Sequence, residues 1–576
     1  MAADMAAEAP VKKSRMMWAL LAVIILVIAG VGVYFATRSA VPAEKVLVVG
    51  TTDDEITFDT ADSYDYFSIN LLQNTMAMLL TYVPGTTDLK PDLLTEVPTL
   101  ANGGISANSL LYTLHIRSGA KFETGDAINA TVVKYSIDRA VKLNGLPGFL
   151  LEPIKGATGY WNVSANPDGS WPPAKQSAWN NYTAQGIQKV DDLTVTIHLW
   201  RKWSPFPALL AFTITAPVNM KSFTDEKYYP NVIVSSGPYR MRNYIPHQRY
   251  ELEANPNYFG TSPVVKRVTI VRYTTASNLK LAITTGAIDI AYRSILPQDF
   301  NDFKSNSNVR TMEGQSPYIR YLVFNTCSPA GVISLWCPRA TPFQDVRLRR
   351  ALAYATDRAD INSTAYAGSV APLYSLIPMG MFGHTEALRS VYGSAPNLAA
   401  AQALLTAAGY SAGSKFAFKL WYTPSHYGDP EIFVAQALKR AWEATGMITV
   451  TLDQTDWASY KAAYRTGGFD VFLLGWFPDY FDPDNYVFPF LHSSGTPSFG
   501  NWYKNVTMDG KIVDQAATSD PATRQADFTE IQSGLAWDAP YIPLFQGTQQ
   551  VVFKPTVTGI VLDPIQFFRY FTINVT

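Results

Sequence analysis

Strands and helices alternate between residues 416 and 474 in a way that only one class of sheet accommodates. Short apolar or alternating runs at Phe416 to Tyr422, Ile448 to Leu452 and Phe469 to Leu474 predict three strands. Two helices separate them, one from Asp429 to Gly446 and one from Trp457 to Arg465. Successive strand–helix–strand units predict a parallel sheet in an α/β fold, because parallel strands require a crossover connection.

The third of these strands leads into a loop that combines aromatic rings with carboxylates. Solutes bound by parallel sheets collect at the carboxyl ends of strands, so we expect the loop at 475–486 and residues 421–422 to share one rim. Within the loop, Trp476, Asp479 and Asp482 offer a stacking surface and fixed charges, which suits the binding of a solute. The alternative is an ordinary loop whose rings cap a core and whose aspartates face water.

Composition indicates a large globular protein and excludes several functions. With 576 residues, 47% hydrophobic and 16% charged, the chain has material for about three domains. The net charge is −1 and the basic residues are scattered, which excludes nucleic acid as a partner.

The six histidines are scattered too, and no G-x-S-x-G, H-E-x-x-H or P-loop motif occurs. We therefore predict no enzyme, no metal and no cofactor, and any transport role must take its energy from a partner.

The N-terminus directs the chain to a membrane. Met16 to Ala36 is a run of 21 residues without a charge, and three basic residues precede it. Such a run spans a hydrocarbon core of about 30 Å, and the basic flank places the N-terminus inside. We expect a cytoplasmic segment at 1–15, an uncleaved transmembrane anchor at 16–36, a linker at 37–44 and an extracytoplasmic remainder. A cleavable signal peptide, whose apolar region is usually shorter, is the alternative.

The extracytoplasmic location predicted for the residues after the linker makes a disulfide and N-glycosylation possible. Cys327 and Cys337, the two cysteines of the chain, bracket a short loop and predict a local disulfide. Asn-x-Ser/Thr sequons are candidates for glycosylation if the organism has the machinery. They lie at Asn129, Asn162, Asn181, Asn362, Asn505 and Asn574.

Two further segments carry structural predictions. Residues 145–185 are rich in Pro, Gly, Asn and Trp without a periodic pattern, which predicts a long loop. Asp345 begins a helix with apolar residues on one face. The basic residues of this region predict a solvated or inter-domain face; they are Arg347, Arg349, Arg350 and Arg358.

Several segments together carry a resemblance to a known family. They are F-D-T-A at 58–61, A-K-F-E-T-G-D-A-I-N-A-T-V-V-K-Y-S-I-D-R-A at 120–140, S-G-P-Y-R to N-P-N-Y-F at 236–259, G-A-I-D-I at 286–290, F-N-T at 324–326, P-F-Q-D-V-R-L-R-R-A-L-A-Y-A-T-D-R at 342–358, G-W-F-P-D-Y-F-D-P-D-N-Y at 475–486 and P-L at 543–544. In number, order and spacing they resemble the extracytoplasmic solute-binding proteins of ABC importers, the oligopeptide-, dipeptide- and nickel-binding family known as family 5.

The resemblance implies a two-lobed α/β clamshell of the class II periplasmic-binding-protein type, enlarged by an extra domain and preceded by the transmembrane helix. The solute enclosed between the lobes is handed to a permease and its ATPase. Family proportions give lobe I about residues 45–86, 206–292 and 536–576, the extra domain 87–205, and lobe II 293–535.

The resemblance also implies roles for particular residues. In the peptide-binding branch, an aspartate of the loop matching 475–486 holds the α-ammonium group of the ligand. Asp479 is the first choice for this role and Asp482 the second, because Asp482-Pro483 resembles turn chemistry. Dipeptide binders have an arginine for the ligand carboxylate after the strand matching 416–422, whereas this chain offers His426. We therefore expect longer peptides rather than strict dipeptide selectivity.

Other ligand classes and functions stay open at this point. Some members of the family bind oligosaccharides, which stack on aromatic rings. The candidate stacking residues are Trp421, Tyr422, Trp476, Tyr64 and Tyr66. Alternatives of a different class are a secreted hydrolase, which would turn over its ligand, and a structural cell-surface glycoprotein, which would bind no solute.

Overall fold

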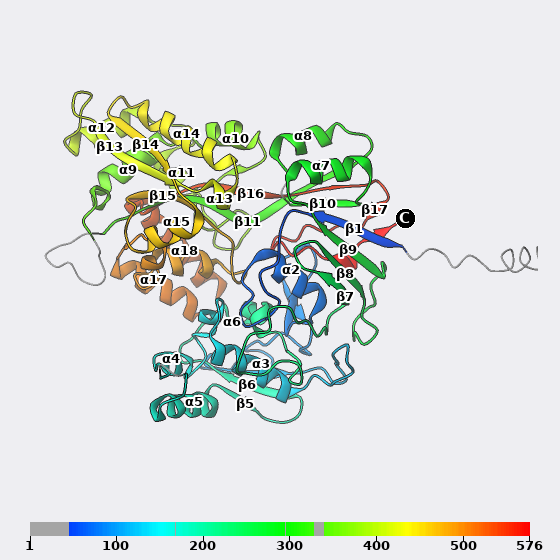
Figure 1. The fold of residues 1–576 in the computed structure, drawn as a ribbon. Coiled ribbons are helices and arrows are strands. Elements are labelled where there is room, and N and C mark those ends of the chain that lie inside the picture. Colours follow the sequence, from blue (N-terminus) through cyan, green and yellow to red (C-terminus); the bar gives the residue numbers. More distant parts are fainter. Residues whose placement is uncertain (1–44, 167–168, 294, 328–338) are drawn as a thin grey trace, which may run out of the picture. The chain divides into compact units, whose positions relative to one another are not determined.

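The computed structural model describes residues 45–166, 169–293, 295–327 and 339–576 (Figure 1). The predicted cytoplasmic segment, anchor and linker at 1–44 lie outside these residues, and so does Cys337. Cys327 is buried, and its predicted disulfide with Cys337 stays a prediction. Within the described ranges, no helix combines the length and apolar character needed to cross a bilayer.

One long mixed sheet organises residues Leu47–Thr576. Its strand order is β14-β13-β15-β11-β16-β10-β1-β9-β8-β7, with β12 (Ala371–Pro372) paired to β16. The bounds are β1 Val46–Thr51, β7 Tyr239–Ile245, β8 Arg249–Ala254, β9 Arg267–Arg272, β10 Ile290–Tyr292, β11 Arg310–Phe324, β13 Phe416–Tyr422, β14 Ile448–Gln454, β15 Val471–Trp476 and β16 Tyr541–Phe553.

The parallel arrangement predicted for 416–474 is confirmed. β13 pairs in parallel with both β14 and β15, and α14 (Pro430–Glu443) and α15 (Trp457–Arg465) make the connections. The other helices are α2 Tyr66–Thr75, α3 Ala130–Leu143, α4 Ala157–Trp161, α5 Pro173–Gln185, α6 Phe206–Leu209, α7 Ala276–Thr285, α8 Pro297–Lys304, α9 Val346–Ala355, α10 Arg358–Tyr366, α11 Ala387–Tyr392, α12 Leu398–Ala407, α13 Pro424–Tyr427, α16 Phe488–Leu491, α17 Val506–Ala517 and α18 Pro521–Asp538.

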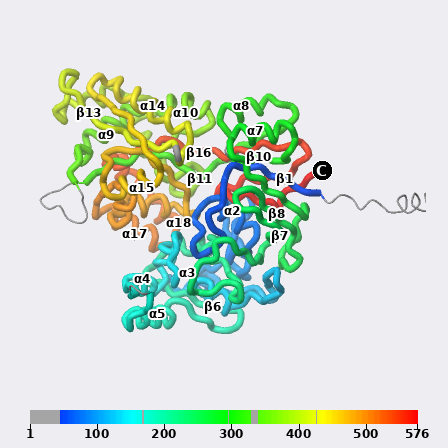
Figure 2. Tube along the Cα trace, viewed as in Figure 1, coloured from blue at the N-terminus to red at the C-terminus, as the bar shows by residue number. Residues whose placement is uncertain are grey.

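Two large hydrophobic cores share the sheet. The first core draws on residues 47–292 and 551–573 together with Tyr480 and Ala516, and the second core draws on other residues within 319–545. The antiparallel strands β11 and β16 run between the two parts of the chain (Figures 1 and 2). Their pairing register shifts between Gln315 and Ile319, an irregularity of the kind that bends strands. The two cores are thus joined by two continuous strands with a bulge between them.

A second sheet, in the order β4-β6-β5, packs with α3 into the first core. Its strands are β4 (Leu111–His115), β6 (Thr194–His198) and β5 (Ile187–Lys189). The loop predicted at 145–185 is wrong in part, because α4 and α5 form there. α5 buries only Tyr182, so its sequence shows no apolar stripe. Short two-stranded pairs complete the described strands: β2 (Leu80–Tyr82) with β3 (Leu89–Pro91), and β17 (Val557–Thr558) with β18 (Asn574–Val575).

Two segments that carried the family resemblance meet in a buried ion pair. The Arg139 guanidinium donates to both carboxylate oxygens of Asp59, at 2.8 and 2.6 Å. Both side chains are at most 1% exposed, and Arg139 also donates to the carbonyl oxygens of Thr224 and Lys227. The pair connects residues 80 positions apart, so these segments specify a tertiary contact.

The prediction of a solvated or inter-domain basic face is wrong for two of its arginines. Arg349 and Arg358 are buried and donate to backbone carbonyls, Arg349 to that of Asp538 and Arg358 to that of Pro543. Such bonds offset the cost of burying a guanidinium. Arg347 behaves as predicted, since it is exposed and pairs with Asp345 at 2.7 Å.

Candidate ligand-binding site

A cavity of about 270 Å³ lies between the loop that follows β15 and the N-terminal part of α2. Its lining comes from residues within 64–73, 208–212, 476–481 and 565–566, together with Tyr82. The cavity therefore collects side chains from both ends of the chain and from the ring-rich loop. Most of these side chains are aromatic or aliphatic, as in ordinary small-molecule sites.

Asp479 is a buried carboxylate at this cavity, and both of its oxygens accept hydrogen bonds. The residue is 5% exposed, and the Tyr64 hydroxyl donates a hydrogen bond to its Oδ1. The Asn485 amide donates to Oδ2 at 3.1 Å, while the Asp479 backbone N–H donates to the Asn485 side-chain oxygen at 2.9 Å. The Trp476 indole donates to the same Asn485 oxygen at 3.1 Å. Asn485 thus fixes the positions of both Asp479 and Trp476.

The protonation of Asp479 reflects this environment. Burial raises the pKa of its carboxyl to about 6, and the hydrogen bonds from Tyr64 and Asn485 oppose that rise. Within the described chain, no basic side chain contributes to the shift. Asp479 is therefore a buried carboxylate that is held by neutral donors and lacks a positive partner, a situation that favours the arrival of a cation.

Tyr66, the first residue of α2, lines the cavity and contacts the loop that follows β15. Its hydroxyl donates to the Gln566 carbonyl oxygen at 2.9 Å and lies 2.9 Å from the Tyr292 hydroxyl. The ring meets Phe477 edge to face at a centroid distance of 5.9 Å, and the Arg293 guanidinium lies 3.7 Å from the ring centroid on Tyr66. These contacts hold the ring rigidly at the cavity.

Four of the eight predicted ligand residues line the cavity: Asp479, Trp476, Tyr64 and Tyr66. Asp482 does not line it. Its carboxylate pairs with Arg524 at 2.7 Å and accepts from the backbone N–H of Asp484 at 2.9 Å, which is the turn chemistry expected of Asp482-Pro483.

The other three predicted residues lie on β13 and the turn after it, away from the cavity. Trp421 stacks on Phe469 at 4.3 Å, and Tyr422 is buried in the second core. His426 stacks on Trp457 at 3.9 Å. Burial lowers the pKa of His426 to about 4, and the positive charges of Arg320 and Lys461 contribute to this decrease. His426 therefore carries no charge at neutral pH.

Sequence reasoning missed two residues that shape the site. Asn485 orients Asp479 and Trp476, and the signal that could have indicated it is an amide between two ring-rich stretches. Gln566 has a left-handed φ of +59°, and its side-chain oxygen accepts from Ser316 at 2.7 Å, next to the β11 bulge. No local pattern in the sequence identifies Gln566.

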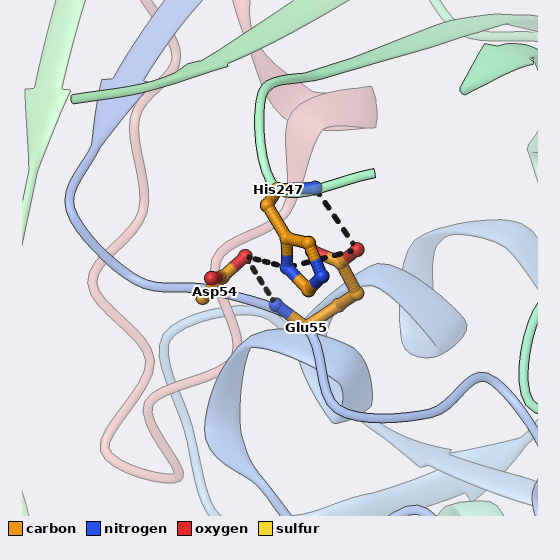
Figure 3. Close-up of side chains that lie close together, drawn as sticks. All are labelled: Asp54, Glu55 and His247. Carbon is orange, nitrogen blue, oxygen red and sulfur yellow. Dashed lines mark hydrogen bonds and ion pairs between the residues drawn. The ribbon is translucent and has the colours of Figure 1, made fainter. Parts of the chain in front are cut away.

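One group of metal-ligating side chains comes together elsewhere in the described residues: Asp54, Glu55 and His247 (Figure 3). The His247 ring nitrogen lies 3.0 Å from Asp54, and the His247 backbone N–H donates to Glu55 at 3.1 Å. Tyr244 and Tyr250 also donate to Glu55, and Arg272 lies 3.3 Å from Asp54. These donors already occupy the carboxylates, so the group ties the β7–β8 hairpin to the segment after β1.

Replacing His247 by Gln should weaken this tie only where His247 is protonated. The hydrogen bond to Asp54, with the charge of Glu55, raises the pKa of His247 above its ordinary value. The stabilisation is therefore complete below about pH 6.5, the unfolded value, and disappears as pH rises through the folded value. Urea denaturation at several pH values should show a difference between the two proteins that vanishes in alkaline buffer. A difference that is constant with pH would contradict the assignment.

The sequons differ in accessibility. Asn162 and Asn181 are exposed, whereas the Asn505 amide nitrogen donates to Tyr503 and Asp538 at 3.1 and 3.2 Å. Asn129 accepts from the Val132 backbone N–H as the N-cap of α3. Asn362 and Asn574 are half-buried.

Comparison with known proteins identifies the family. The bacterial extracellular solute-binding proteins, family 5, match residues 88–498 through their middle region. The chain belongs to this family. It is accordingly an extracytoplasmic solute-binding protein of an importer and not an enzyme, which removes the hydrolase alternative.

Individual relatives agree over nearly the whole chain. The probable D,D-dipeptide-binding periplasmic protein DdpA of Escherichia coli K12 is 25% identical over 553 residues, 93% of this chain and 95% of its own length. The murein tripeptide-binding protein MppA in its unliganded open form and the DppA protein of Helicobacter pylori in complex with the peptide STSA have TM-scores of 0.70 and 0.71. Each is 21% identical and covers 92% of this chain and 98% of its own. The predicted two-lobed, mixed α/β binding-protein fold is confirmed.

Proposed function

We propose that this chain is the substrate-binding subunit of an ABC importer, which captures peptides between its two lobes and delivers them to the permease and its ATPase. One observation carries the choice of peptides. Asp479 presents a buried carboxylate at the cavity, oriented by two neutral donors and without a positive partner among the described residues. The α-ammonium group of a peptide supplies that missing charge.

Enclosure strengthens this contact. An ammonium group beside Asp479 is shielded from water by the surrounding rings, and the attraction between the charges grows as the local dielectric constant falls. Tyr66 and Phe477 offer faces and edges for peptide side chains. Ring contacts of this kind accept many side chains, which suits a binder of varied peptides.

Ligand binding and lobe closure are linked in this proposal. Tyr64 and Tyr66 pack against the first core, whereas Trp476 ends β15 and Asp479 belongs to the loop that follows it. A peptide that touches both sides stabilises the closed form, so ligand concentration sets the closed fraction that the permease encounters.

Calorimetry of the ectodomain with a peptide panel and an oligosaccharide panel tests the proposal. We expect saturable binding of peptides with a free N-terminus, and no binding of the same peptides after N-acetylation, because acetylation removes the charge that Asp479 meets. Oligosaccharides are the second candidate, since Tyr66, Trp476 and Phe477 are also stacking surfaces for sugars. Binding of sugars alone would select that candidate, and binding of neither panel would contradict both.

We further infer that residues 16–36 anchor the protein in the membrane, with lobe I at 45–86, 206–292 and 536–576, the extra domain at 87–205 and lobe II at 293–535. The charge-free run after three basic residues supports the anchor. Glycosylation is proposed for the exposed Asn162 and Asn181 only. Fractionation of the full chain tests the anchor, because release of the protein in soluble form would rule it out.

A further inference from the structure

A contact between the first core and the loop that follows β15 lies beside the cavity and centres on Trp203. This residue follows β6, and its indole N–H donates to Asp484 Oδ2 at 3.1 Å. Its ring meets Tyr480 edge to face at a centroid distance of 5.1 Å. Trp203 is 4% and Asp484 2% exposed, so the hydrogen bond is shielded from water.

Asp484 is held on its own side by several neighbours. The Tyr480 hydroxyl donates to Oδ2 at 2.7 Å, and the Gln515 amide donates to Oδ1. Arg524 pairs with the adjacent Asp482 and not with Asp484. Asp484 is therefore a fixed, buried acceptor, and Trp203 is the donor that comes to it from the first core.

Packing around Trp203 extends this contact into an interface. Tyr480 and Ala516 belong to the first core together with Trp203, although Tyr486 and Ile512, close to them in sequence, belong to the second. The backbone N–H of Ser204 donates to the Ala516 carbonyl oxygen at 2.7 Å. The interface does not require a ligand, because all of its partners are protein groups.

The same short loop carries both this contact and the cavity. Asp479 and Tyr480 line the cavity, and the Tyr480 hydroxyl bonds to Asp484 on the other side of the loop. Asn485, which orients Asp479, follows Asp484 directly. A shift of Asp484 is thereby transmitted to the carboxylate at the cavity.

We propose that the Trp203–Asp484 contact positions the 476–486 loop and holds the two cores together independently of the ligand. A contact between the two cores that opening would break favours the closed form by its own free energy, and affinity for every ligand scales with the closed fraction. Peptide affinity is a readout that rests on the proposed function. The opening of the ligand-free protein is a second readout, and it does not depend on that function.

Trp203→Phe tests the proposal, because it keeps an aromatic ring and removes the indole N–H. Loss of a hydrogen bond to a charged acceptor predicts affinity about tenfold weaker for every peptide, with unchanged ratios between peptides. Spin labels at the exposed positions Val190 and Phe433 should report longer distances in the ligand-free variant. Trp200→Phe is the matched control, since Trp200 is 53% exposed and bonds to Glu152.

Asp484→Asn supplies a second, independent variant. It keeps an acceptor of the same size and removes the charge, so we expect a smaller loss and a non-additive effect when it is combined with Trp203→Phe. Unchanged label distances in both variants, or a loss confined to one peptide, would overturn the proposal. If no peptide binds to the unmodified protein, the proposed function fails, and the label distances alone still decide whether Trp203 holds the cores together.

Discussion

Replacing Asp479 by Asn is expected to weaken the binding of a peptide with a free N-terminus by at least about 25-fold. Asn keeps the size of the side chain and an acceptor for the Tyr64 hydroxyl, but it removes the charge that faces the ammonium group. Truncation or neutralisation of one partner of a buried charge pair costs about 2–5 kcal/mol of binding free energy. Calorimetry at neutral pH measures the change directly.

The pH dependence of binding provides the control for this variant. Because the pKa of Asp479 is raised to about 6, its carboxylate takes up a proton as pH falls below that value. The ammonium group of the peptide keeps its proton there, since it loses it only near pH 8. The affinity of the unmodified protein for peptides should therefore decrease below about pH 6, and the affinity of the Asn variant should not show this decrease. Equal affinities of the unmodified protein and the Asn variant, or the same decrease of affinity at acid pH in both, would show that Asp479 does not contact the ammonium group.

Arg139→Met is expected to destabilise the protein by about 3–5 kcal/mol, because it leaves the Asp59 carboxylate buried without a counter-charge. The loss should appear as a lower free energy of unfolding in urea. Adding Asp59→Leu should recover much of it, since an apolar pair of similar volume removes the uncompensated charge.

The surface pair of Arg347 with Asp345 gives the matched control. Arg347 is 47% exposed, so Arg347→Met should cost less than about 1 kcal/mol. A similar decrease in the free energy of unfolding for Arg139→Met and Arg347→Met would mean that burial does not increase the contribution of the Arg139–Asp59 pair to stability.

Sequence patterns were sufficient for the strands and helices between 416 and 474, because apolar periodicity and helix caps are local signals. The resemblance to the family singled out Asp479, which lines the cavity in the structure. Its contact with a ligand stays a prediction. Trp421 and Tyr422, the last two residues of β13, do not line the cavity, although the strand pattern predicts them on the same rim as the loop. Trp421 stacks on Phe469 and packs against the second core, and Tyr422 is buried within that core, so both rings are used in packing.

The remaining errors have two causes: partners that lie far apart along the chain, and the lack of an apolar stripe in α5. Arg349 and Arg358 are buried because acceptors from Asp538 and Pro543 reach them, and no local pattern announces those partners. α5 buries a single residue and so lacks the stripe by which a helix is recognised. Gln566 lies at the cavity because the chain returns to α2 after β17, where the Gln566 carbonyl oxygen accepts from the Tyr66 hydroxyl.

The division of the first core between both ends of the chain dictates when it can form. Residues 551–573 complete a core that begins at Leu47, and β16 lies between β10 and β11 in the sheet. During synthesis and export, the early segments must therefore wait for the last part of the chain before their apolar surfaces are covered. Because β16 and residues 551–573 emerge late, they are the segments that complete the first core. A chain that lacks them leaves the apolar surfaces of the earliest segments exposed to proteases.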